Sequence, residues 1–188
     1  MNTPTHAIVN LVILGKGESD KFNLAIIIGS LLPDLPMFWF YFWVKFVEKL
    51  PSSQIWKEAY FEPFWQNIFD IPNSIILCLI GVAISHWLQK PFWKIMFISM
   101  IIHCIFDFFV HNDDAHRHFL PLTNYRFISP FSYWDPRHHG KLVALGELIL
   151  LIGSSLYLYP NYSSWWIKIS LLGFSTLYLI FYLQFYIL

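Results

Sequence analysis

The second half of the sequence contains three long apolar segments, at residues 92–110, 142–159 and 165–188. About 20 apolar residues in a helix, at a rise of 1.5 Å per residue, cross the ~30 Å hydrocarbon core of a bilayer. Charged residues make up only 13% of the chain, against about 25% in a typical soluble domain. Too few charges remain to cover a water-facing surface. The pattern therefore predicts an all-α polytopic integral membrane protein.

Earlier apolar stretches bring the expected total to five or six helical segments within one transmembrane domain, residues 1–188. The first two, at residues 7–14 and 22–32, are short and are separated by a polar link, so we expect an N-terminal short helical hairpin. Pro4 after Thr3 is typical of a helix start, with Thr3 as the cap. Further apolar segments lie at residues 37–47 and 75–88.

Two polar stretches are expected outside the membrane. Residues 48–71 contain Pro51 and Pro63 and are interpreted as a loop with a short helix. Residues 111–141 form the longest polar stretch and are interpreted as an extramembrane loop that carries a His/Asp cluster. In a six-span model the two loops share one side of the membrane and together carry more Lys and Arg, which favours a cytoplasmic location for this side.

Several function classes find no support in the sequence. Twelve basic residues balance twelve acidic ones, so nucleic acid is not an expected partner. Both cysteines lie in apolar runs, which argues against a disulfide framework. No basic region opens the chain, so a cleaved signal peptide is not expected. The sequence has no nucleophile elbow, P-loop or dinucleotide fingerprint, and covalent catalysis is therefore not favoured.

Six of the eight histidines fall between His103 and His139. His103, Asp107 and His111 are spaced four residues apart, which places them on one face of a helix. His and Asp one turn apart can bind one divalent ion, but a straight helix holds His111 too far from His103 to share it. An ionised Asp inside an apolar helix costs about 2.5–3.5 kcal/mol on insertion, and a bound cation would offset its charge. A hydrogen-bonded pair between helices is the alternative.

The expected hairpin carries two further candidates. His6 precedes its turn and Asp34 follows it, so the hairpin brings both side chains to the same end. Asp34 stands between Pro33 and Pro36, where a helix must end or bend. We expect His6 to be a metal ligand and Asp34 to be a ligand or general base. For Asp34, a helix cap is the alternative.

The segment 111–118 supplies more possible ligands, because it contains two carboxylates and three histidines. We expect His111 and His116 to bind metal, Asp114 to act as a base and Arg117 to stabilise negative charge. A solvated acidic turn with exposed histidines is the alternative. Glu147, in the apolar segment 142–159, is open to a role as ligand, histidine partner or ion-pair member.

At these residues the chain resembles a family of small bacterial integral membrane proteins described as metal-dependent hydrolases. The shared pattern is an N-terminal His (His6), a Leu-Pro-Asp segment ending in Asp34, and a later helix with His103 and Asp107. The segment 111–136 looks more like an uncharacterised branch found in cyanobacteria. The resemblance implies a bacterial inner membrane or thylakoid-like membrane. One position departs from the pattern, since Asn73 stands where the family carries a His.

These observations favour a metal-dependent hydrolase at the bilayer surface, with one or two divalent ions, zinc being favoured, and a phosphoester or lipid-like substrate. A divalent-cation transporter or sensor would use the same residues but needs a polar path across the bilayer. A non-catalytic structural partner in a membrane complex would use the histidines as hydrogen-bonding groups. The position of the cluster along the helices discriminates between these hypotheses, because a hydrolase needs its site at a rim open to water and headgroups.

Overall fold

The computed structural model describes residues 1–188 and is entirely helical, with 69% of residues in helices and no strand. The all-α prediction is confirmed. The helices are α1 (Thr3–Leu14), α2 (Asn23–Leu31), α3 (Leu35–Phe42) continued by the π-helix η1 (Trp43–Val47), α4 (Ser52–Lys57), the 3₁₀ turn η2 (Ala59–Phe61), α5 (Pro63–Asp70), α6 (Ile75–Trp87), α7 (Pro91–Phe108), the 3₁₀ turn η3 (Pro136–His138), α8 (Gly140–Leu158), the 3₁₀ turn η4 (Tyr159–Asn161) and α9 (Trp165–Tyr186).

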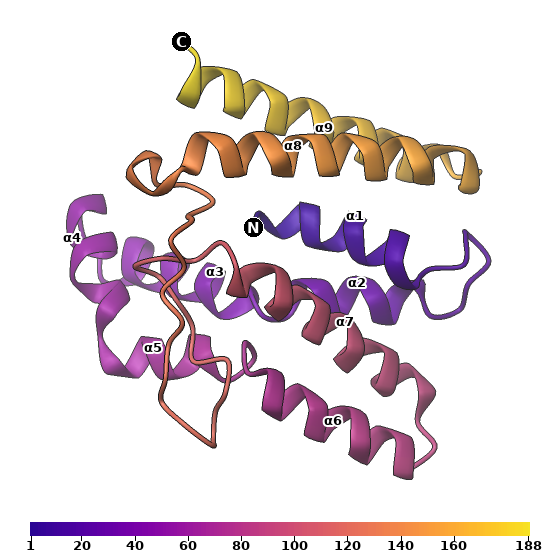
Figure 1. The fold of residues 1–188 in the computed structure, drawn as a ribbon, viewed down its shortest axis with the longest axis horizontal. Helices are drawn as coiled ribbons and strands as arrows, with labels where there is room; N and C mark the ends of the chain where they lie inside the picture. Colours follow the sequence, from indigo (N-terminus) through magenta and orange to yellow (C-terminus); the bar gives the residue numbers. More distant parts are fainter.

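Six of these helices run side by side, in the order α9, α8, α1, α2, α7, α6 (Figure 1). Three segments are long and apolar enough to cross a membrane: Pro91–Phe108, Gly140–Asn161 and Trp165–Tyr186. The count rises to five if two bent pairs each form one span, namely α2 with α3–η1, bent by 50°, and α5 with α6, bent by 40°. The architecture is compatible with an integral membrane protein.

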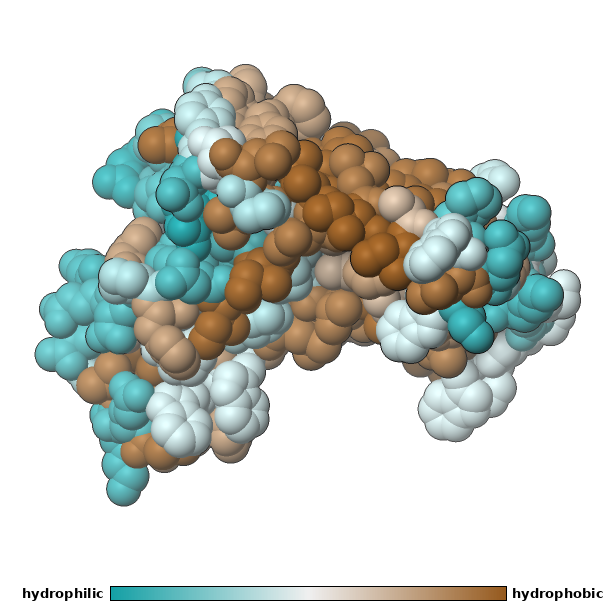
Figure 2. Space-filling view, turned by 90° about the horizontal axis from the view of Figure 1, so that it is seen from below, coloured by the Kyte–Doolittle hydropathy of each residue, from teal (hydrophilic) through white to brown (hydrophobic).

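Polar and apolar side chains are separated along the helix axes. Hydrophilic residues gather at both ends of the molecule, and apolar residues cover the middle (Figure 2). One end consists of the turns between long helices, and the other consists of α4, α5 and the loop between α7 and α8 (Figure 1). This distribution matches a bilayer lying across the middle, because apolar surface is stable in contact with lipid.

The N-terminal hairpin forms, with α1 packed against α2. Its start differs by one residue from the sequence interpretation. Thr3 is the first helical residue, Asn2 is the N-cap, and no side chain caps the helix. The Thr3 hydroxyl instead donates to Asp34 Oδ2 at 2.6 Å. The hairpin thus ties the start of α1 to the end of α2.

Residues 48–71 contain more structure than the expected loop with one short helix. They form α4, η2 and α5, whose apolar faces pack on α3 around the fully buried side chain of Phe40. Trp65 and Phe69 from α5 make edge contacts with the Phe40 ring at 5.1 and 5.4 Å between centroids. Proline marks helix starts here, at N-cap Pro51 and at the first residue of α5.

Close packing of α2 on α7 depends on Gly29. A Cβ at this position would overlap the carbonyl oxygen of Met96 and lie 2.8 Å from Ser99 Cβ. We expect Gly29→Ala to destabilise the fold by about 1–3 kcal/mol, because a backbone atom cannot move aside as a flexible side chain can. Gly173→Ala is the control, since nothing lies within 4 Å of its added methyl group. Thermal unfolding measures both; equal midpoints would contradict the packing argument.

Candidate metal centre

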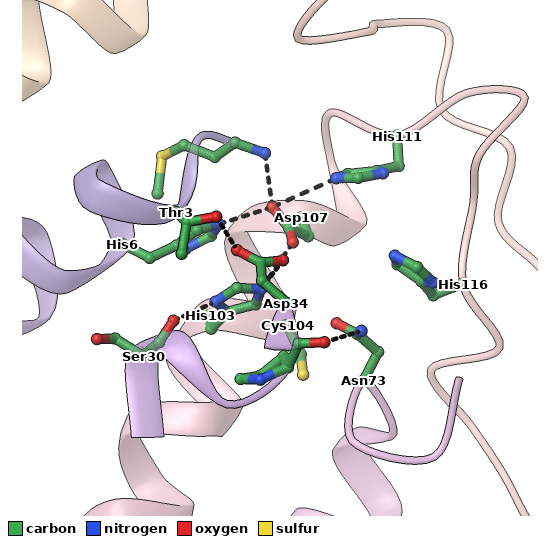
Figure 3. A network of polar contacts seen from close by, with 12 residues as sticks. Thr3, His6, Ser30, Asp34, Asn73, His103, Cys104, Asp107, His111 and His116 are labelled. Carbon is green, nitrogen blue, oxygen red and sulfur yellow. Dashed lines mark hydrogen bonds and ion pairs between the residues drawn. The ribbon is translucent and has the colours of Figure 1, made fainter. Parts of the chain in front are cut away.

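His103 and Asp107 lie one turn apart on α7, in its last two turns. Both side chains are buried. The sequence puts them on one face, and the structure places His103 Nε2 2.9 Å from Asp107 Oδ2 (Figure 3). The polar pair therefore lies where α7 reaches the end of the molecule that carries the long loop.

His6 joins this pair from α1. Its Nε2 atom lies 2.9 Å from Asp107 Oδ1, and its ring stacks on the His103 ring at 3.6 Å between centroids. One ligand atom from each of these three buried residues falls within 4.8 Å of the others. His6, His103 and Asp107 could thus hold a metal ion.

The hydrogen bonding of His103 tests whether such an ion fits. His103 Nδ1 lies 2.8 Å from the carbonyl oxygen of Ser30, which can only accept, so Nδ1 carries the proton. In the neutral ring, Nε2 then presents a lone pair toward the Asp107 carboxylate, and it has no hydrogen-bond partner. Either a bound cation or a second ring proton on Nε2 satisfies two acceptors that face each other. The Ser30 carbonyl is also the usual kind of partner that orients a metal-binding histidine.

Asp34 lies beside the same nitrogen. It occupies the break between α2 and α3, and its Oδ1 atom is 3.5 Å from His103 Nε2. The hydroxyl of Thr3 holds the other carboxylate oxygen. Asp34 and Asp107 therefore approach His103 Nε2 together, which concentrates negative charge where a cation would bind.

His111 reaches the site because the chain turns after α7 ends at Phe108. Its Nε2 atom lies 3.5 Å from Asp107 Oδ1, and its Nδ1 atom lies 3.0 Å from Asp114 Oδ2. Burial disfavours the charged ring, but the carboxylates of Asp114 and Asp107 outweigh burial and raise the pKa of His111 to about 9. At neutral pH His111 is therefore protonated on both ring nitrogens, and it would have to lose the Nε2 proton to bind a metal ion.

Besides the His111 ring, the N-terminal ammonium group also lies at the Asp107 carboxylate. The ammonium group of Met1 is 2.7 Å from Asp107 Oδ1. Asn2, the next residue, donates its backbone N–H and its side-chain amide to Glu147 Oε1 on α8, at 2.7 and 3.1 Å. Glu147 therefore anchors the start of α1 and does not contact the cluster.

Arg117 and His116 belong to a different contact network, centred on Asp70. Arg117 Nε lies 2.6 Å and Arg126 Nη2 2.7 Å from the fully buried Asp70 carboxylate. His116 Nδ1 is 3.3 Å from Asp70 Oδ1, and its ring is 5.3 Å from the His111 ring. His116 thus lies beside the cluster and contacts Asp70, and the Arg117 guanidinium is ion-paired with Asp70.

Sequence reasoning did not single out Ser30 or Asp70, and it missed the role of Thr3. Ser30 acts through its backbone carbonyl, for which a sequence carries no signal. Asn73, noted as a departure from the family pattern, donates to the carbonyls of Pro33 and Phe69 at 3.2 and 3.0 Å, while its Oδ1 atom is buried without a partner. Asn73 thus supports the chain around Asp34.

His118 is a structural residue. It is buried, its Nδ1 atom lies 2.8 Å from the carbonyl oxygen of Asn73, and burial lowers its pKa to about 4. His118 is therefore neutral at ordinary pH and fixes the loop against the start of α6, where its own carbonyl accepts from the backbone N–H of Ile75.

A cavity of about 720 Å³ opens beside the cluster. Its lining includes two of the candidate carboxylates, Asp34 and Asp114, and two of the candidate histidines, His111 and His116. The volume falls within the ~300–1,000 Å³ of ligand-binding sites. A small molecule in this cavity would contact Asp34 and His111, which lie 3.5 Å from His103 Nε2 and Asp107 Oδ1.

Comparison of the chain with models of protein families, with curated proteins and with solved structures finds no significant match. The candidate site consequently rests on its own geometry.

Proposed function

We propose that this chain is a membrane-embedded metal-dependent hydrolase that acts at the bilayer surface. The observation that carries the proposal is the buried His6–His103–Asp107 group, whose ligand atoms converge beside a cavity with a polar wall. The resemblance drawn from His6, Asp34, His103 and Asp107 points to the same class.

The chemistry assigns a role to each side chain. His6, His103 and Asp107 would hold the ion, with His111 or Asp34 as a further ligand, and imidazole with carboxylate donors favours zinc. A bound divalent ion supplies Lewis-acid polarisation and an activated water. Asp34 lines the cavity and would accept a proton. Asp114 holds the His111 ring, and the lipid bilayer is the expected surrounding.

The position of the site favours a hydrolase over a cation carrier. The cluster lies at the end of the helices that carries the long loop (Figure 1). Further into the bundle, the polar side chains of Asn10 and Ser99 bind each other, and Ser99 also donates to the Ile26 carbonyl. These groups are neutral, so they offer no charged step for a divalent ion crossing the bilayer.

The test combines metal content with turnover in protein purified in a native-like bilayer. We expect zinc-loaded wild type to hydrolyse members of a panel of phosphomonoesters, phosphodiesters and carboxylic esters. We expect His103→Ala to lower kcat/KM at least about 100-fold, because even residues that only orient a ligand contribute 10- to 100-fold. His86→Ala is the control, since His86 is exposed at the end of α6, away from the cluster. Stoichiometric metal without turnover of any ester class would favour the carrier or sensor instead.

A further inference from the structure

The cavity beside the metal centre has two chemically distinct halves. Its polar half, formed by Asp34, His111, Asp114 and His116, adjoins the metal cluster. Its other half runs along α1, from Thr3 to Leu11, a distance of about 12 Å at 1.5 Å per residue. A ligand that fills both halves must therefore be polar at one end and apolar along most of its length.

The apolar wall is built by two helix faces. On α1, Pro4, Ile8 and Leu11 recur at the spacing of one face, and on α9, Ile167, Leu171 and Phe174 do the same. The one polar side chain of the α9 wall, Ser170, donates its hydroxyl to the Trp166 carbonyl within the helix. The wall thus presents no free hydrogen-bonding group, which excludes a sugar or a peptide backbone as its occupant.

The cavity also reaches the apolar outer surface of the molecule. Two of its lining residues, Phe38 and Phe174, are 53% and 42% exposed. Large apolar side chains at the opening match entry from the acyl-chain region of a bilayer, where water-soluble substrates are scarce. The cavity is therefore accessible from the place where a lipid chain already lies.

We propose that the substrate is a membrane amphiphile whose apolar chain lies in the groove between α1 and α9, with its hydrolysable polar head at the metal cluster. That the amphiphile is a substrate rests on the proposed function. Binding of its apolar chain in the groove does not require that the protein hydrolyses it. Because the chain leaves a lipid environment that is already apolar, its burial in the groove contributes little net binding energy. Discrimination therefore depends on the polar head and the shape of the groove.

The test uses a probe that needs no turnover, hexadecylphosphocholine carrying a photoactivatable diazirine in its chain, with the protein in phosphatidylcholine nanodiscs. Labelling from a specific groove is saturable and is displaced by unlabelled hexadecylphosphocholine, whereas labelling by bulk lipid is not. We expect displaceable labelling on peptides that contain Ile8, Leu11 and Leu171. Ser170→Trp places an indole in the groove and should lower displaceable labelling at least about tenfold, because the groove has no room for both.

Ile169→Trp is the matched control. Ile169 neighbours Ser170 on α9, is 48% exposed and does not line the cavity, so the same indole points away from the groove. Thermal unfolding shows that both variants are folded. Equal displaceable labelling in the two variants, or none in the wild type, would overturn the proposal. Displaceable labelling without hydrolysis of any ester would reject the proposed function and leave chain binding intact.

Discussion

Replacing Asp107 with asparagine is expected to abolish high-affinity binding of divalent ions. Asp107 lies 2.9 Å from His6 Nε2 through Oδ1 and 2.9 Å from His103 Nε2 through Oδ2, so its carboxylate joins the two histidine rings through polar atoms. Asparagine keeps the shape of the side chain and removes the charge that a cation needs. When free metal exceeds the dissociation constant 100-fold, loss of binding removes about 2.7 kcal/mol of stabilisation. Metal analysis and thermal unfolding with and without a chelator measure both effects.

The chelator separates a metal ligand from a group that only joins helices. In the wild type, the chelator should lower the unfolding midpoint by about 5–10 °C, as expected for this loss in a chain of similar size. It should change little further in Asp107→Asn. Asp113→Asn is the control, because this carboxylate is exposed and makes no contact with the cluster. If the chelator leaves the unfolding midpoint of the wild type unchanged, the metal hypothesis is wrong. Hydrogen bonding between helices would then be the role of Asp107.

Replacing Asp70 with asparagine is expected to destabilise the protein by about 2–4 kcal/mol. The Asp70 carboxylate is fully buried and binds the guanidinium groups of Arg117 and Arg126. Removing one partner of a buried ion pair leaves the other charges uncompensated, which costs about 3–5 kcal/mol. We expect less than the upper figure because the two arginine side chains are 17% and 29% exposed and water screens part of their charge.

An ion pair with one exposed partner provides the comparison. Arg137 binds Asp135, but its side chain is 79% exposed, so Arg137→Gln should change stability by less than about 1 kcal/mol. Denaturant or thermal unfolding compares the two variants directly. Because Asp70 also holds the loop that carries His111, Asp70→Asn should weaken metal affinity too. Wild-type stability in Asp70→Asn would show that the buried network contributes nothing to the fold.

The part of the site that sequence could predict follows from local geometry. Four-residue spacing on a helix is sufficient to pair His103 with Asp107, and a polar link between two short apolar segments is sufficient to bring the start of α1 beside Asp34. Each inference needs only a helical repeat or one turn. The cost of polar groups in an apolar helix supplied the reason for them to converge.

The rest depends on tertiary contacts that no local pattern encodes. Asp70 lies at the end of the proline-containing stretch 48–71. The sequence of this stretch suggests a loop, and only the packing of its apolar side chains around Phe40 makes it helical. His111 enters the site through a turn just after α7, whereas a continuing helix would carry it away. Two partners of Arg117, Asn67 and Asp70, lie about 50 residues earlier in the chain. Tertiary packing determines these features and overrides the local conformational preference of each segment.

The ligand atoms of the metal cluster come from segments made at very different times. His6 emerges first, Asp34 follows, and Asp107 and His111 emerge only after most of the chain has been synthesised. At about 5–20 residues per second, several seconds separate the first ligand from the last. During that interval His6 and Asp34 have no partners from α7, so they cannot retain an ion tightly. If the cluster binds an ion, tight retention of that ion would require that α1, α2 and α7 have already packed together.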